Sequence, residues 1–394
     1  MRVRLLSLFS ALLCSFTAFA ACGGPPERPL THIQLPAHPF SVVESADACW
    51  LFITMSGVQN PPHAIAVFQR KGGRFLNKRE VPVPGNPFDM AISHDGKLLI
   101  VVAIDSVSFL DAQALATGRG PFVVGTMRYG PDTAQPIYAN FSPDDRFAFV
   151  SDEHAQRVTV IDMAKARSTH FSASAIVGTI PTGYAPIALT FSPDGKLLYN
   201  TSEVGDPSWK WPARCKQEGK TSEELTRPEG AIEVIDVAKA ETDPANAVLA
   251  RVPAGCSPVR LAITPDGSTV WLTARNSNAV MAFDTAKLLS DAEHARVASV
   301  SVGTAPVGIA VFDGGKRVIA TNSNRFGQPT ENQVLNVIDA EAALAGKAAI
   351  LGTIEAGAFP REISLSRDGK ILFVSNWMSN TVQVLDVARL PLRK

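Results

Sequence analysis

The sequence predicts an all-β chain that folds as a seven-bladed β-propeller, a ring of seven four-stranded antiparallel sheets. Three observations predict this fold. One unit recurs seven times along the 394 residues, each unit has the alternating pattern of strands around a turn motif, and the two ends of the chain are complementary parts of one unit. Repeat periods of about 20 to 50 residues are typical of solenoids and propellers.

Each unit opens with a proline and reaches a turn eight residues later. The clearest copies read PIALTFSPDG at 186–195 and PVRLAITPDG at 258–267. Pro-Asp-Gly suits a hairpin turn, because proline fixes φ and glycine tolerates a positive φ. The opening prolines are Pro39, Pro87, Pro136, Pro186, Pro258, Pro306 and Pro360, and the turn positions are Asp47, Asp95, Asp144, Asp194, Asp266, Gly314 and Asp368.

A third strand of alternating apolar residues ends each unit. It closes with an aspartate in six copies: Asp111, Asp162, Asp236, Asp284, Asp339 and Asp386. This recurrence favours a turn or strand-end role for the aspartates over a catalytic one. The distance from opening proline to closing aspartate is 26 residues in three copies and varies in the others, so insertions fall between the second and third strands.

The two ends of the chain predict how the ring closes. A fourth strand precedes each opening proline, and its first copy, residues 31–36, has no strands before it. The last unit, in turn, has no fourth strand after it. We therefore expect the N-terminal strand to complete the C-terminal blade, which removes the exposed edges of an open array.

The motifs LYNT, FVSN and VIDV at these spacings resemble the YVTN-type β-propeller repeat family over about residues 31–390. The resemblance implies seven blades of four strands. For function it implies only a scaffold, since propellers of this kind serve as lactone hydrolases, as dehydrogenase subunits and as surface proteins.

The first 21 residues are predicted to be an export signal. Arg2 and Arg4 precede a short apolar stretch, and Ala18-Phe19-Ala20 has the small-x-small pattern of a cleavage site. Two outcomes remain open: cleavage after Ala20, or use of Phe19–Cys22 as a lipobox. We predict lipidation of Cys22, residues 22–30 as a tether, and a periplasmic or secreted protein, anchored to the membrane as a lipoprotein.

Export places the remaining cysteines in an oxidising compartment. Cys49 lies in an apolar run and is expected to be a buried free thiol. The largest insertion, residues 202–230 in blade four, contains Cys215 and emerges beside the loop that contains Cys256. A Cys215–Cys256 disulfide is therefore predicted, and residues 31–394 are expected to form a single propeller.

The loops between the second and third strands share one face, and on that face we expect the ligand. Trp209, Trp211 and Asp206 lie in the insertion, and Trp377 lies in the last blade. The two insertion tryptophans are interpreted either as packing the insertion onto the rim or as an aromatic platform for a sugar, peptide or protein.

The position 17 residues after each opening proline gives a column of charges. It places Glu153, Glu203 and Arg275 on consecutive blades, with His154 beside the first. These residues are weak candidates for acid–base catalysis or for a divalent cation such as calcium. The alternative is a solvated rim whose charges pair with each other.

The charge balance and the absence of known catalytic motifs exclude several classes of function. The net charge is zero, with 37 basic and 37 acidic residues, which gives no support for nucleic-acid binding. HExxH, CxxC, CxxCH, GxSxG and P-loop motifs are absent. We therefore expect a monomeric binding or scaffold protein of the cell envelope, without a cofactor, that binds an envelope protein or a small molecule. The alternatives are a lactonase-like hydrolase and a non-catalytic subunit of a periplasmic redox complex.

Overall fold

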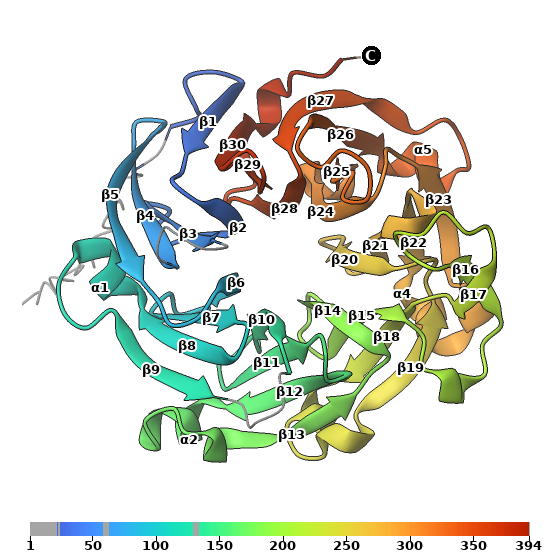
Figure 1. The fold of residues 1–394 in the computed structure, drawn as a ribbon, viewed down its shortest axis with the longest axis horizontal. Helices are drawn as coiled ribbons and strands as arrows, with labels where there is room; N and C mark the ends of the chain where they lie inside the picture. The colour runs from blue at the N-terminus through green and yellow to red at the C-terminus, as the bar shows by residue number, and fades with distance from the viewer. Residues whose placement is uncertain (1–21, 23, 58–62, 129–133, 394) are drawn as a thin grey trace, which may run out of the picture.

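The computed structural model describes residues 22, 24–57, 63–128 and 134–393. Seven four-stranded antiparallel sheets are arranged around a common axis, as Figure 1 shows. The predicted seven-bladed propeller is therefore confirmed. The export signal predicted for residues 1–21 lies outside the described residues.

Each blade runs outward from its inner strand in sequence order. Blade one contains β2 (His38–Glu44), β3 (Trp50–Ser56), β4 (Ala64–Lys71) and β5 (Arg74–Pro82). Blade two contains β6 (Pro87–Ile92), β7 (Leu98–Ala103), β8 (Ser106–Asp111) and β9 (Val123–Arg128). Blade three contains β10 (Pro136–Phe141), β11 (Phe147–Asp152), β12 (Arg157–Asp162) and β13 (Ile176–Pro181).

The remaining blades repeat this order. Blade four contains β14 (Tyr184–Phe191), β15 (Leu197–Val204), β18 (Ala231–Asp236) and β19 (Val248–Pro253). Blade five contains β20 (Pro258–Ile263), β21 (Thr269–Ala274), β22 (Ala279–Asp284) and β23 (Arg296–Ser301). Blade six contains β24 (Pro306–Phe312), β25 (Arg317–Asn322), β26 (Asn332–Asp339) and β27 (Ile350–Ala358). Blade seven contains β28 (Pro360–Leu365), β29 (Ile371–Asn376), β30 (Thr381–Asp386) and, as its outer strand, β1 (Leu30–Gln34).

The pairing of β1 with β30 closes the ring. The two strands are antiparallel, and Leu30 lies opposite Leu385 while Gln34 lies opposite Thr381. The predicted closure is thus confirmed, although the strand begins one residue before the predicted 31–36 and ends two residues before it. By pairing with β30, β1 covers the edge that the last blade would otherwise expose at its outer side.

The recurrent aspartates have local structural roles. Asp194 shows the pattern of the turn aspartates: its carboxylate accepts hydrogen bonds from the Ser192 hydroxyl at 2.6 Å and from the Lys196 amide at 3.2 Å. Five closing aspartates accept backbone N–H bonds at helix N-termini. The helices capped in this way are α1 (Ala112–Thr117), α2 (Met163–Ser168), α3 (Val237–Ala240), α4 (Thr285–Ser290) and α5 (Ala340–Leu344). The turn and strand-end interpretation therefore agrees with the structure.

The hydrophobic core consists of layers between neighbouring blades. One layer joins blades two and three, where Phe109 stacks on Phe171 with ring centroids 4.4 Å apart. Another joins blades seven and one through Phe373, which meets Phe75 edge-on at 5.8 Å. Because each blade buries both faces against its neighbours, its second strand is a continuous apolar run, as in β7, where all six residues are buried. Among the described residues, no helix is long and apolar enough to cross a lipid bilayer.

Two cysteine assignments differ from the expectations. Cys49 forms a disulfide with Cys22, so the prediction of a free Cys49 thiol is wrong. The same bond occupies the Cys22 sulfur, which lipidation would require. Residues 24–29, expected to form a flexible tether, lie against the propeller, and Pro26 is buried. Sequence alone could not find this pair, because nothing in the repeat register relates residue 22 to the loop before β3.

Candidate functional site

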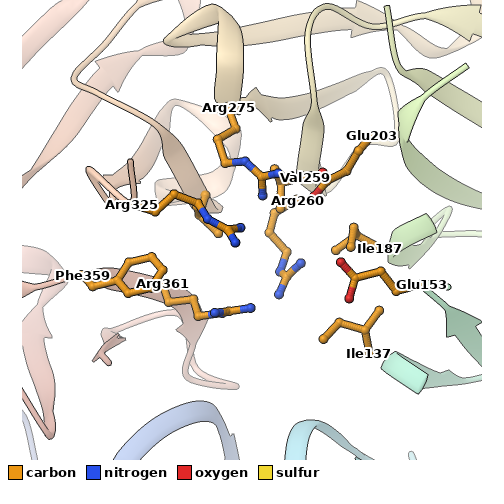
Figure 2. Close-up of a pocket in the computed structure, with 11 residues that line it drawn as sticks. Ile137, Glu153, Ile187, Glu203, Val259, Arg260, Arg275, Arg325, Phe359 and Arg361 are labelled. Carbon is orange, nitrogen blue, oxygen red and sulfur yellow. Dashed lines mark hydrogen bonds and ion pairs between the residues drawn. The ribbon is translucent and has the colours of Figure 1, made fainter. Parts of the chain in front are cut away.

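The candidate site is a pocket at the mouth of the central channel. It brings together Glu153, Glu203 and Arg275, as the repeat register predicted. The pocket is narrow: its volume is about 360 Å³ when the open solvent at its mouth is included, and only about 20 Å³ admits the centre of a water molecule. Its lining residues, most of which Figure 2 labels, are Ile137, Glu153, Ile187, Glu203, Val259, Arg260, Arg275, Val307, Arg325, Phe359 and Arg361.

Arg275 holds two carboxylates at the edge of the pocket. It begins the 3₁₀ turn Arg275–Ser277 that follows β21, and its side chain is 4% exposed. Its guanidinium lies 2.6 Å from a carboxylate oxygen of Glu203 and also pairs with Glu218. Burial raises the pKa of Glu203, although the charge of Arg275 opposes the shift. Burial raises the pKa of Glu218, but the hydrogen bond and charge of Arg275, together with the charges of Arg325 and Arg227, outweigh burial and leave this pKa lowered.

Glu218 is a site residue that the sequence did not reveal. It lies in the hairpin of β16 (Ala213–Lys216) and β17 (Leu225–Pro228), which is the core of the insertion. Cys215 bonds to Cys256 with Cα atoms 5.6 Å apart, and the predicted disulfide is thus confirmed. The insertion is therefore fixed against the mouth of the channel at the base of the hairpin.

Glu153 lies across the pocket from the arginines. It is half-buried and accepts a hydrogen bond of 2.8 Å from the Gln135 side chain. Within the described chain no cation lies within ion-pair distance of its carboxylate. Figure 2 shows the Glu153 carboxylate pointing toward the guanidinium groups of Arg260 and Arg361. His154, proposed with it, is exposed and does not line the pocket, so the structure does not bring this imidazole to the site.

Three further arginines face the pocket, and the repeat register did not predict them. Arg260 pairs with Glu362 at 2.7 Å, whereas neither Arg325 nor Arg361 has a carboxylate within 4.0 Å in the part of the chain described. Arg361 follows an opening proline, where every other blade has an apolar residue. That single charged residue in an otherwise apolar column was the signal that could have identified it.

Arg361 is a half-buried cation. Its Nε is buried and has no hydrogen-bond partner among the residues that the structure describes, and its guanidinium lies over the Phe40 ring, 4.4 Å from the centroid. Burial, together with the positive charges of Arg260 and Arg325, lowers the pKa of Arg361 to about 9. The side chain therefore still carries its positive charge at neutral pH, and no carboxylate of the described residues pairs with it.

The floor of the pocket has an apolar layer, with buried charged groups packed against it. Five inner-strand residues form an apolar ring, Phe40, Ile137, Ile187, Val259 and Val307. Against this ring lie the Arg260–Glu362 pair and the buried carboxyl of Asp89. Burial and the nearby charge of Glu362 raise the pKa of Asp89 to about 7. The channel is thus filled by side chains beneath the mouth.

The arrangement favours an anion over a cation. Four guanidinium groups and two carboxylates line the pocket, and Glu203 already pairs with Arg275. Among the described residues, no group of three or more histidine, cysteine, aspartate or glutamate side chains is placed to hold a metal ion. The candidate cation site at Glu153 and Glu203 therefore lies in positively charged surroundings.

The aromatic residues proposed for the ligand face lie outside this pocket. Trp209 and Trp211 are half-buried neighbours, with ring centroids 4.9 Å apart and Arg251 over the Trp209 ring at 5.1 Å. They pack against Gly183 and Gly205, where a Cβ would come within about 3 Å of the indole rings. Their contacts thus match the packing interpretation, and their role as a platform stays a prediction.

Asp206 and Trp377 also have structural contacts. Asp206 accepts a bond of 2.8 Å from the Ser208 amide at the start of the turn Pro207–Trp209. Trp377 stacks on His38 at 4.2 Å, and its indole N–H donates to the Ser56 hydroxyl at 3.1 Å. Trp377 therefore joins blade seven to blade one beside the ring closure.

Comparison with known proteins agrees with this architecture. A chain from the "Kuenenia stuttgartiensis Hydrazine Synthase" structure is 21% identical, with a TM-score of 0.64 over 91% of this chain and 98% of that one. A chain from a "Crystal Structure of Mitotic Checkpoint Complex" is 14% identical, with a TM-score of 0.65 over 98% of this chain and 99% of that one. At these identities the likeness shows the fold alone. A search of curated proteins found no match.

One family is identified by its sequence model. The model described as "Lactonase, 7-bladed beta-propeller" matches residues 106–326, more than half of the chain. The matched part runs from blade two to the loop that contains Arg325, and so includes most of the pocket. The chain belongs to the family of seven-bladed β-propeller lactonases.

Proposed function

We propose that this protein is an exported binding protein whose ligand carries an anionic group, a carboxylate or a phosphate, that binds at the mouth of the channel. One observation carries the proposal: Arg325 and Arg361 face the same pocket, and neither has a carboxylate partner in the described chain. Two disulfides are compatible with an oxidising compartment outside the cytoplasm.

The physical reason is the imbalance of charge. A half-buried cation without a partner destabilises the folded protein, and an anionic ligand would supply the missing partner. Guanidinium groups bind carboxylate and phosphate oxygens through two parallel hydrogen bonds, which gives strength and orientation. Arg361 also retains an unpartnered Nε–H, so it has a donor free for such a bond.

The size of the pocket limits what enters it. Only a small group fits between the arginines and the apolar ring, so the rest of the ligand would lie over the rim. Phe326 is 47% exposed and lies beside Arg275, whose guanidinium is 5.9 Å from the centre of its ring, so it offers an apolar contact there. The proposed ligand is therefore an anionic small molecule, or an anionic group of a larger partner.

A titration with inorganic phosphate and with succinate at low ionic strength tests this proposal. Isothermal calorimetry on the native protein should show saturable binding of at least one of them. Arg361→Met should weaken that binding about tenfold or more, the usual effect of losing a charge-assisted bond. Arg119→Met is the matched control, because it removes the same charge at an exposed position outside the pocket. No binding by the native protein, or equal binding by Arg361→Met, would contradict the proposal.

Lactone hydrolysis is the second candidate. The family match favours it, and so does Glu153, a carboxylate without a cation partner in the described chain that faces the same pocket. Glu153 would take a proton from water while the arginines stabilise the developing oxyanion. His154 is exposed and lies outside the pocket lining, so this candidate function rests on Glu153.

A hydrolysis assay with δ-gluconolactone distinguishes the two functions. For an enzyme, the native protein should exceed the spontaneous rate, and Glu153→Gln should lose about a hundredfold or more of that excess. Glu224→Gln, at an exposed position outside the pocket, is the control. If the native protein binds anions but does not hydrolyse the lactone, only the binding function remains supported. The third alternative, a subunit of a redox complex, gains no support from a likeness that extends only to fold.

A further inference from the structure

The segment before β1 is fixed to both blades that meet at the ring closure. On blade one, the Arg70 guanidinium donates to the Gly24 carbonyl at 3.1 Å. On blade seven, Arg389 donates to the Pro26 carbonyl at 2.6 Å, and the Asp386 amide donates to the Pro29 carbonyl at 3.0 Å. Residues 24–29 therefore bridge the last and first blades beside β1, whose position Figure 1 shows.

Two residues of blade one, Gly73 and Arg70, contact this segment. Gly73, in the turn between β4 and β5, has a φ of +79°, and a Cβ there would lie 2.4 Å from the Pro25 carbonyl oxygen. Only glycine permits that approach. Arg70 itself is held by Glu44 at 3.1 Å, and both side chains are 5% exposed. The receptor for the segment is thus built from buried, fixed groups.

A covalent bond completes the attachment. Cys22 is joined to Cys49 with Cα atoms 5.0 Å apart, within the ordinary range for a disulfide. The loop around Cys49 is itself fixed, because the Asp47 carboxylate accepts a bond of 3.0 Å from the Cys49 amide. The disulfide therefore links the N-terminal segment to the loop between β2 and β3 of blade one.

We infer that Cys22 is retained in the mature protein as half of a disulfide that locks the ring closure, and that it is not a lipid-attachment site. Signal cleavage then falls before Cys22, at the site after Ala20. The two thiols lose two protons and two electrons to the disulfide of a thiol oxidoreductase, which becomes a dithiol. A thioether lipid uses the same sulfur, so one Cys22 cannot carry both modifications.

Counting free thiols distinguishes the two fates of Cys22. The full-length gene is expressed in a bacterial host that exports it, the mature N-terminus is mapped, and thiols are titrated in the denatured, unreduced chain. The disulfide predicts no free thiol in the native sequence and one in each of Cys49→Ser and Cys22→Ser. Lipidation predicts one free thiol in the native sequence, that of Cys49, and none in Cys49→Ser.

Two further measurements complete the test. Unreduced peptide mapping should find the Cys22 and Cys49 peptides joined, and detergent phase partitioning should leave the native protein in the aqueous phase. A lipid mass on the Cys22 peptide, or free thiols at both cysteines, would overturn the inference.

The locking role has its own readout. Hydrogen exchange of the β1 amides, Leu30–Gln34, should be at least about tenfold faster in Cys22→Ser than in the native protein, because β1 then opens more often from the edge of blade seven. The β20 amides on the other side of the ring should exchange at the same rate in both. Unchanged exchange in β1 would show that the disulfide does not secure the closure.

Discussion

Arg260 of blade five forms an ion pair with Glu362 of blade seven, across blade six, at 2.7 Å. Gly308 of blade six lies between them against the backbone of blade seven, since a Cβ there would be 3.0 Å from the Arg361 carbonyl oxygen. Both charged side chains are less than a tenth exposed. The pair connects two non-adjacent blades beneath the pocket and holds the floor against which an anion would bind.

Removing one partner of this pair should destabilise the protein. Glu362→Gln leaves Arg260 as a buried cation, and we expect the free energy of unfolding to fall by about 3 kcal/mol. Denaturant titration measures the change. Replacing both partners with apolar residues, Arg260→Met with Glu362→Leu, should recover most of it, because no unpaired charge remains. If Glu362→Gln is as stable as the native protein, the ion pair does not stabilise the fold and this prediction is wrong.

Arg361 should behave in the opposite way. It has no carboxylate partner in the described chain, so Arg361→Met removes a half-buried, uncompensated charge while its apolar stem is retained. We expect unchanged or higher stability by about 1 kcal/mol, together with the loss of anion binding. Thermal unfolding and calorimetry on the same sample check both parts. A marked loss of stability would indicate a structural role instead.

Glu233 should make stability fall with rising pH. Its carboxyl is fully buried and accepts bonds from the Gly183 amide at 2.7 Å and the Ser202 hydroxyl at 2.9 Å. Burial raises its pKa to about 7, so between about pH 4.5 and 7 the folded state holds a proton that the unfolded chain releases. The contribution of Glu233 to the free energy of unfolding is fully present at low pH. It decreases by on the order of 3 kcal/mol as the pH rises through that window.

Glu233→Gln removes this contribution and retains an acceptor for Gly183. Relative to the native protein, the variant should therefore be more stable at pH 8 than at pH 5, as measured by denaturant titration at both pH values. Asp89, whose pKa is also raised to about 7 by burial, adds a contribution of the same sign that the variant keeps. Identical pH dependence in the two proteins would contradict the prediction.

Loss of the second disulfide should loosen the insertion. The Cys215–Cys256 bond closes a separation of 41 residues, which corresponds to roughly 3–4 kcal/mol on the chain-entropy estimate. Cys256→Ser should lower the free energy of unfolding by up to that amount and expose residues 217–224 to limited proteolysis. Treatment of the native protein with reductant is the parallel measurement, and unchanged proteolysis in both would show that Glu218 and Arg275 hold the hairpin without the bond.

The sequence could predict the parts of this protein that repeat. Pro186, Asp194 and Asp236 recur at equivalent positions in most units, because every blade needs the same turn and strand end. The ring closure followed from counting strands, and the Cys215–Cys256 bond from where an insertion must emerge. Register also brought Glu203 to Arg275, since equal offsets in neighbouring blades place residues at the same height.

Only the tertiary structure decided which charges meet inside the ring. Arg260 and Glu362 lie 102 residues apart, and Arg361 became a pocket residue only when seven inner strands converged on one axis. The repeat specifies each blade separately, because its turns and strands are local. Contacts across the axis, like the bond of Cys22 to Cys49, depend on where separate units end up in space, and no local pattern encodes that.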